Sequence, residues 1–189
     1  MEVLRPPELP ELAVIRPDVH GDARGFFVET FHLERYREVG IGLPFVQDNL
    51  SVSGPGILRG LHFQHPHAQG KLVRVVEGEV FDVAVDIRVG SPRFGRWFGA
   101  RLTAESQRQL WIPPDFAHGF VTLGGGARFS YKCTDHYHPE CDHTLRWDDP
   151  AVGIEWPLET PELSAKDRSG STLAELEAAG LLPVYAERA

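Results

Sequence analysis

Proline and glycine are spread along this chain and cut it into short apolar runs. The 189 residues include 15 prolines and 19 glycines, and these are not pooled in one linker. Because such residues favour turns, the segments between them have the length of strands rather than of helices. The spacing predicts roughly ten short strands in an all-β jelly roll or barrel, with short helices near the C-terminus.

The expected strands can be placed by their apolar and β-branched residues. Residues 32–39 are expected to form one or two helical turns. Ser171, with Glu175 further on, is expected to open a helix that Gly180 ends. The GGGA sequence at 124–127 is expected to be a tight hairpin turn. Strands are predicted over residues 25–31, 45–53, 57–64, 71–76, 80–87, 96–102, 109–112, 116–123 and 128–134.

Alternation within residues 80–87 separates two faces of one strand. Phe81, Val83, Val85 and Ile87 share the face expected in the core. The opposite face carries Asp82 and Asp86, and in a barrel it either meets solvent or lines an enclosed polar cavity. The pattern leaves both alternatives open.

The stretch ILRGLHFQ, residues 57–64, places a guanidinium and an imidazole among apolar residues. An apolar setting shifts the pKa of an enclosed histidine, which makes Arg59 and His62 candidates for chemistry. Gly60 is expected to mark a β-bulge that re-aims Arg59. If residues 57–64 and 71–76 form a hairpin, Lys71 lies opposite or diagonal to His62.

Charge and composition exclude several classes of partner. The 19 basic and 27 acidic residues give a net charge of −8, which disfavours nucleic acid and anionic membranes but allows a local basic pocket. The two cysteines and the absence of an apolar leader predict a cytoplasmic protein.

We expect one domain over residues 1–189, with a core at about 10–160 and a polar, helical C-terminal segment at 161–189.

Metal and nucleophile chemistry fit the residues poorly. His65 and His67, followed by His118, suggest a metal-binding pattern, but Lys71 stands where a carboxylate ligand is needed. An ammonium group has no lone pair to donate and repels a divalent ion. Cys133 lies in a strand pattern and no GxSxG sequence accompanies it. No catalytic metal is therefore expected.

Proton transfer uses the residues that are present. His62 is a candidate base, Lys71 can stabilise an enolate oxygen, and Tyr131 can deliver a proton. Asp167 is a candidate to orient the His62 imidazole. Its spacing from His62 does not itself bring the two together.

The ordered series GDARGFFVETF, FVQDNLS, ILRGLHFQ, QGKLVRVVEGEVFDVAVDIR, QLWIPPDFAHGFVTL, YKCTDHYHPE, RWDDP, GIEWP and LSAKD resembles the dTDP-4-dehydrorhamnose 3,5-epimerase family. The resemblance covers roughly residues 10 to 170 in unbroken order. It implies a cupin-type jelly roll that acts as a homodimer, without a metal or other cofactor. The implied substrate is dTDP-4-dehydro-6-deoxyglucose, inverted at carbons 3 and 5 on the route to dTDP-rhamnose.

The same resemblance implies a role for each site residue. His62 would accept the proton, held by Asp167, and Tyr131 would donate from the opposite ring face. Tyr137 would stack on thymine, and Asp142 stands where a glutamate is common. The remaining positions implied in substrate binding are Lys71 and His118 at the sugar, Arg59 at the diphosphate, Arg24 and Glu29 reaching into a partner subunit, and Gln47, Asp48, Asn49 and Lys166.

Three other functions compete with this one. A related enzyme would epimerise a single carbon of a dTDP-keto sugar or isomerise its keto group. A cupin module would bind a nucleotide sugar without turnover. A metal-dependent oxygenase is the third alternative.

Overall fold

Two long strands form the centre of the fold. Strand β7 (Lys71–Asp86) and strand β10 (Phe116–Cys133) pair antiparallel, from Phe116 opposite Asp86 to Cys133 opposite Lys71. The structure is a computed structural model that describes residues 1–186. Residues 187–189, the end of the predicted segment 161–189, lie outside the described residues.

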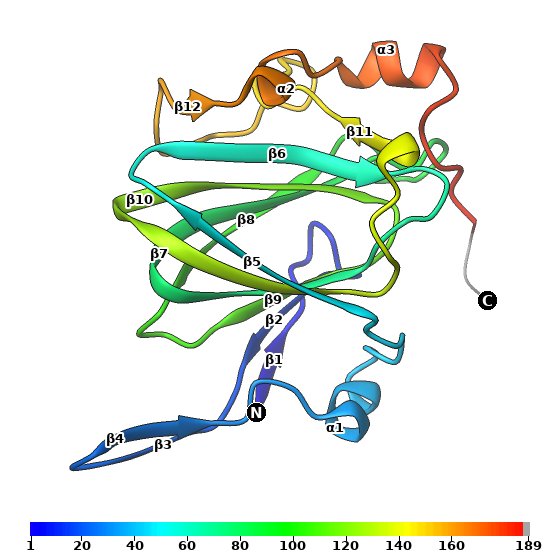
Figure 1. The fold of residues 1–189 in the computed structure, drawn as a ribbon. Helices are drawn as coiled ribbons and strands as arrows, with labels where there is room; N and C mark the ends of the chain where they lie inside the picture. The colour runs from blue at the N-terminus through cyan, green and yellow to red at the C-terminus, as the bar shows by residue number, and fades with distance from the viewer. Residues whose placement is uncertain (187–189) are drawn as a thin grey trace.

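The other strands extend this pair into a barrel (Figure 1). One sheet follows the order β1-β2-β9-β7-β10-β6-β11, and β5, β8 and β12 join it beside β10, β7 and β6. A separate hairpin of β3 and β4 projects from the barrel. The all-β prediction is confirmed. The strand bounds are β1 (Glu2–Leu4), β2 (Ala13–Arg16), β3 (Val19–Asp22), β4 (Gly25–Val28), β5 (Gln47–Ser53), β6 (Ile57–Gln64), β8 (Trp97–Thr103), β9 (Gln109–Ile112), β11 (Asp142–Thr144) and β12 (Glu162–Leu163).

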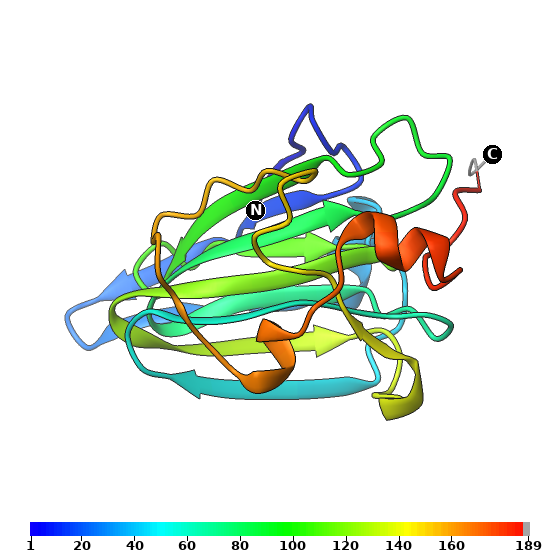
Figure 2. The same ribbon diagram turned by 90° about the horizontal axis from the view of Figure 1, so that it is seen from above.

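Short helices cover one side of the barrel, next to β6 and β11 (Figures 1 and 2). They are α2 (Ala165–Arg168) and α3 (Leu173–Ala178), with a 3-10 turn at Pro139–Cys141; α1 (Leu33–Glu38) lies near the N-terminal strands. The predicted C-terminal helix begins one residue late, because Thr172 rather than Ser171 is its N-cap. Thr172 forms a reciprocal capping box with Glu175.

Both faces of β7 are buried over residues 82–86, which resolves the open question about residues 80–87. Val83 and Val85 pack with Leu173 and Leu176 of α3 on the outside of the barrel wall. The opposite face points into the barrel, where Asp82 is completely buried. Asp82 therefore lies in an enclosed polar interior and not at the solvent surface.

Two predicted chain breaks are wrong. The segments at 71–76 and 80–87 are one strand, β7, and GGGA lies inside β10 instead of forming a hairpin turn. The two strands bend together, since the register shifts between Leu123 and Ala127. Gly78 (φ +81°) and Gly126 (φ +100°) supply the positive φ, and a Cβ on Gly78 would lie 2.0 Å from the Gly126 oxygen. Glycine thus bends the strands without ending them.

The predicted hairpin between residues 57–64 and 71–76 is also wrong. Strand β10 lies between β6 and β7 and pairs with both, so that His118 is opposite His62 on one side and Ala84 on the other. The second edge of β6 is occupied by β11 and β12, and that of β7 by β8 and β9. Loop 65–70 therefore connects β6 to β7, although these two strands are not hydrogen-bonded to each other.

Among residues 1–186, no helix is long and apolar enough to cross a membrane.

Candidate active site

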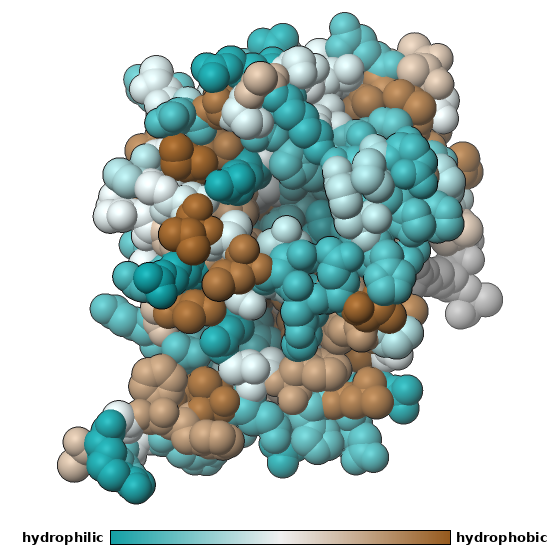
Figure 3. All heavy atoms as spheres, in the orientation of Figure 1, coloured by the Kyte–Doolittle hydropathy of each residue, from teal (hydrophilic) through white to brown (hydrophobic). Residues whose placement is uncertain are grey.

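Two adjoining cavities open into the barrel and share three side chains, those of His62, Lys71 and Tyr131. One cavity has a volume of about 160 Å³ and also contacts Arg59 and His118. The other, of about 100 Å³, extends towards residues of β5 and β11. Figure 3 shows a hollow surrounded by hydrophilic side chains on this face. Strands β5, β6, β7 and β10 thus bring residues from distant parts of the sequence to one place.

A β-bulge at Gly60 puts Arg59 and His62 on the same side of β6. Strict alternation would place side chains three residues apart on opposite faces. Arg59 pairs with Phe120 of β10, and His62 pairs with His118. Two residues of β6 therefore stand opposite the single residue Gly119. Gly60 has φ +125°, and a Cβ there would lie 2.5 Å from the Gly119 Cα atom. The predicted bulge is present and turns both functional side chains into one cavity.

His62 is held by a carboxylate from the C-terminal segment. Its Nε2 atom lies 2.6 Å from Oδ1 of Asp167. The Ser164 hydroxyl donates to Oδ2 of Asp167 at 2.7 Å, and the Gly60 amide donates to Oδ1 at 3.4 Å. Because Ser164 is also the N-cap of α2, the helix start fixes the direction of the Asp167 side chain. The imidazole therefore has one ring nitrogen bound and leaves Nδ1 for chemistry.

The Asp167 carboxylate remains ionised despite its burial. Burial by itself raises the pKa of this carboxyl, but the hydrogen bonds with His62 and Ser164 outweigh it and hold the pKa below its usual value. An ionised carboxylate at Nε2 favours the tautomer with the proton on that nitrogen. It also stabilises the imidazolium that forms when His62 accepts a proton at Nδ1.

A second histidine–aspartate pair lies deeper in the barrel. Nε2 of His118 is 3.0 Å from both carboxylate oxygens of Asp82. Burial lowers the pKa of His118 and raises that of Asp82, because both groups have been removed from water. Burial also lowers the pKa of the Lys71 ammonium. The cavity floor therefore offers polar donors in a dry setting, where hydrogen bonds to a developing anion are strong.

Tyr131 enters the cavity from β10. It is opposite Val73 of β7 and Asn49 of β5, in the half of β10 that follows the bend at Gly126. Burial raises the pKa of its phenol, so the hydroxyl keeps its proton at neutral pH. A protonated phenol and an imidazole base in one cavity can add and remove a proton at a bound carbon atom.

Polar side chains connect the rim of the cavity. The Tyr137 hydroxyl donates to Asp142 at 2.9 Å, and the Tyr137 amide donates to Gln47 at 3.0 Å. Lys166 of α2 also contacts the Asp142 carboxylate. Arg59 donates from Nε to the Ser53 hydroxyl at 2.9 Å, which leaves the end of its guanidinium for another partner. The rim therefore combines an exposed aromatic ring with two cations.

Three of the predicted site residues lie away from the cavity of their own chain. Asp48 alternates with Gln47 and Asn49, points to the outer face of β5 and pairs with Lys132. Arg24 is 90% exposed at the tip of the β3–β4 hairpin. Glu29, after that hairpin, pairs with Arg35 of α1. Within one chain, these residues do not join the other predicted positions.

Several residues at the site were missed in the sequence, although local signals point to some of them. Ser51 shares a face of β5 with Asn49, and Gln64 shares a face of β6 with His62, so period-two alternation indicates both. Ser164 stands three residues before Asp167, the spacing of an N-cap. Alternation places Asp82 on one face of its strand but indicates no role for it. No local signal indicates Phe120 or Phe129, which line the inner cavity.

Comparison with known proteins gives one consistent family. The family model for dTDP-4-dehydrorhamnose 3,5-epimerase matches residues 6–175. A protein of that name from Salmonella typhimurium is 54% identical over 87% of this chain and 92% of its own length. One from Neisseria gonorrhoeae is 55% identical over 92% of this chain, which spans only 53% of that longer protein. A dTDP-4-dehydrorhamnose 3-epimerase from Streptomyces niveus is 42% identical over 97% of this chain and 89% of its own length.

A solved structure agrees with the fold. The crystal structure of a dTDP-6-deoxy-D-glucose-3,5-epimerase from Legionella pneumophila, in complex with dTDP-4-keto-L-rhamnose, superposes with a TM-score of 0.94. It is 52% identical and covers 98% of both chains. The strands that carry the candidate site thus follow the same path in both proteins.

Proposed function

The chain belongs to the dTDP-4-dehydrorhamnose 3,5-epimerase family, and from the geometry of its cavity we propose that it inverts a dTDP-4-keto sugar at carbons 3 and 5. One observation carries the proposal: the His62–Asp167 pair and the Tyr131 phenol line the same cavity. The family match covers most of the chain, and the 3,5-epimerase from Salmonella typhimurium is more similar to the chain than the 3-epimerase from Streptomyces niveus is.

Inversion needs a base on one face of the sugar and an acid on the other. In our proposal Nδ1 of His62 removes the proton from the carbon next to the keto group, while Asp167 holds Nε2 and stabilises the imidazolium. Tyr131 returns a proton from the opposite face, as its raised pKa keeps the hydroxyl protonated. The phenolate then takes a proton from solvent and the imidazolium releases one to solvent, so that both groups are reset before the next inversion.

Removal of the proton places negative charge on the keto oxygen. Lys71 and His118 are the donors that we assign to this oxygen, because both lie in the buried part of the cavity. Asp82 holds Nε2 of His118, so His118 donates from Nδ1 when the pair carries one proton in the Nε2–Asp82 contact and a second proton on Nδ1. Donors that are fixed before the reaction stabilise an enolate without reorganisation.

The rim is assigned to the nucleotide. Arg59 and Lys166 supply local positive charge for the diphosphate, and this resolves how a protein of net charge −8 holds an anion. Tyr137 is 54% exposed and offers its ring to thymine. Gln47 and Asn49 line the same cavity as polar contacts, and Asp142 holds the hydroxyl of Tyr137.

We further propose that the active unit is a homodimer. The β3–β4 hairpin carries Phe26 and Phe27, which are 61% and 69% exposed, and Arg24 at its tip. The outer face of β5 exposes Leu50 and Val52, at 63% and 64%. Two apolar surfaces on one chain can cover each other in a symmetric pair. The hairpin would then bring Arg24 and Glu29 to the partner's cavity, and Asp48 to the interface.

Residues 1–189 are proposed to act as a single domain in the cytoplasm. The C-terminal segment supplies Asp167 to the site and packs Leu173 and Leu176 against the barrel, so it is a structural part of the catalytic unit. Cys133 and Cys141 are both buried thiols, which suits a reducing compartment.

Incubation with the dTDP-4-keto sugar in deuterated water tests the function. We expect deuterium at both carbon 3 and carbon 5 of the sugar, read by mass spectrometry and proton NMR. Deuterium at carbon 3 alone would identify a 3-epimerase. Thermal stabilisation by the nucleotide sugar without any deuterium uptake would instead identify a binding protein and contradict the proposal.

A further inference from the structure

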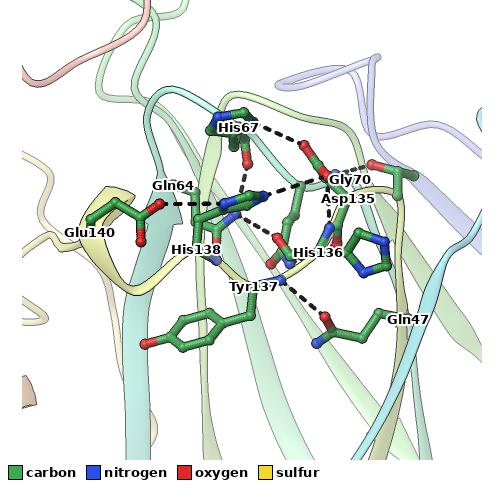
Figure 4. A network of polar contacts seen from close by, with 11 residues as sticks. Gln47, Gln64, His67, Gly70, Asp135, His136, Tyr137, His138 and Glu140 are labelled. Carbon is green, nitrogen blue, oxygen red and sulfur yellow. Dashed lines mark hydrogen bonds and ion pairs between the residues drawn. The ribbon is translucent and has the colours of Figure 1, made fainter.

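Three side chains with metal-binding atoms meet outside the cavities that hold His62. They are His67, from loop 65–70, and Asp135 and His138, from the segment that follows β10 (Figure 4). One ligand atom from each residue lies within 4.8 Å of the other two. In the sequence, the His65–His67 spacing suggests a metal pair. In the structure, His67 lies beside Asp135 and His138, which are about 70 residues further along the chain.

The three groups face one another without forming close hydrogen bonds. Nδ1 of His67 lies 3.6 Å from Oδ2 of Asp135, and Nε2 of His138 lies 3.9 Å from Oδ1 of the same carboxylate. Both distances exceed the usual 2.7–3.2 Å of an N–H···O hydrogen bond. Bonds of about 2.1 Å to one tetrahedral ion need donor atoms roughly 3.4 Å apart, with each imidazole lone pair pointing at the ion, so binding requires the side chains to rotate. The imidazole rings are stacked with their centroids 4.1 Å apart.

The groups around the cluster already orient it. Nδ1 of His138 lies 3.5 Å from Glu140, so its other ring nitrogen faces Asp135. Such a carboxylate behind a histidine is typical of metal ligands. The amide of His136 donates to Oδ1 of Asp135 at 2.8 Å and so fixes that side chain.

Gln64 holds the two backbone segments together. Its amide nitrogen donates to the His67 oxygen at 2.7 Å and to the His136 oxygen at 3.1 Å, and its oxygen accepts from the His138 amide at 2.8 Å. The relative positions of loop 65–70 and the segment 135–138 are therefore fixed before an ion binds. A pre-organised set of ligands loses less entropy when it binds.

We propose that His67, Asp135 and His138 form a binding site for a divalent transition-metal ion of the Zn²⁺ class. Two imidazole nitrogens and one carboxylate suit zinc and its neighbours, whereas magnesium and calcium prefer oxygen ligands alone. With neutral imidazoles the set carries one negative charge, and Glu140 adds a second nearby. The ion has a structural role in this proposal: it links loop 65–70 to the segment 135–138. The site does not depend on the epimerase proposal.

Equilibrium dialysis of the untagged, chelator-treated full chain against ZnCl₂ tests the site. We expect one Zn²⁺ per chain, and a loss of affinity of at least about tenfold in His67→Asn and in His138→Ala. Asparagine is chosen at 67 because that residue has φ +65°, which Asn tolerates. The matched control is His136→Ala, which removes an exposed imidazole from the same segment but leaves the three ligands.

The results separate this site from adventitious binding. A Zn²⁺ affinity that is unchanged in both ligand variants, or that falls equally in His136→Ala, would overturn the proposal, as would the absence of stoichiometric binding. Circular dichroism of the metal-free variants checks that each is folded. A crystal soaked in ZnCl₂ should show an anomalous difference peak between the three ligands, and a peak elsewhere would also count against the site.

Discussion

Nε2 of His62 lies 2.6 Å from Oδ1 of Asp167, although the two residues are 105 positions apart in the chain. The contact joins β6, in the wall of the barrel, to the four-residue helix α2. It orients the imidazole of a strand residue, which is the arrangement that the proposed base requires. The first prediction concerns this pair.

Asp167→Asn is expected to reduce kcat/KM by about 10²- to 10⁴-fold. The amide can still accept from Gly60, but it does not carry the negative charge that stabilises the imidazolium. Steady-state kinetics with the keto sugar measure the loss. Asp148→Asn, which removes an exposed carboxylate paired with Arg146, serves as the control and should retain activity.

His62→Ala and Tyr131→Phe are expected to fail in different ways. Without His62 no proton is abstracted, so deuterium exchange should be lost at both carbon 3 and carbon 5. Tyr131→Phe keeps the base, and exchange should persist while correctly inverted product falls. Proton NMR in deuterated water distinguishes these results, and equal residual inversion in the two variants would disprove the assigned roles.

Mixing two defective variants tests the shared active site. Arg24→Ala should raise KM, and His62→Ala should abolish turnover. If Arg24 serves the partner's cavity, each mixed dimer regains one site with both residues intact, because the defects fall together in the other site. Random exchange of subunits then restores up to about a quarter of wild-type activity. No gain in activity after confirmed subunit exchange would contradict the shared site.

Gly60→Ala is expected to destabilise the fold by at least about 2 kcal/mol. The residue has φ +125°, and the added Cβ would lie 2.5 Å from the Gly119 Cα atom, which is backbone and cannot move aside cheaply. Gly54→Ala is the matched control, because Gly54 has open space around it. Urea unfolding measures both, and similar losses of stability would refute the packing argument.

Asp167 also predicts how stability depends on pH. Its folded-state pKa lies below the usual 3.8, so its contribution to stability is fully present above about pH 5 and is lost as the pH falls through the folded pKa. Asp167→Asn lacks this contribution at every pH. The difference in unfolding free energy between wild type and variant should therefore shrink from pH 5 to pH 3, as urea titrations can show. A constant difference would mean that folding does not shift the pKa of Asp167.

The fold class could be read from the sequence because strand formation leaves local signs. Alternation of apolar residues and the spacing of glycine and proline depend only on near neighbours. The same holds for the start of α3, where Thr172 and Glu175 cap each other across one turn. Local patterns failed where a strand bends without ending, as at Gly78 and Gly126, since turn and bend use the same residue type.

The candidate site shows the same difference between what local sequence indicates and what long-range packing decides. His62, Lys71 and Tyr131 could be named from residue chemistry and family resemblance, and the Gly60 bulge from an isolated glycine in a strand. Only the tertiary structure decided that β10 separates β6 from β7, that Asp82 is an interior partner of His118, and that Asp167 reaches His62. Each of these depends on which strands become neighbours. Which strands become neighbours is determined by how the whole core is buried, and a short stretch of sequence does not carry that information.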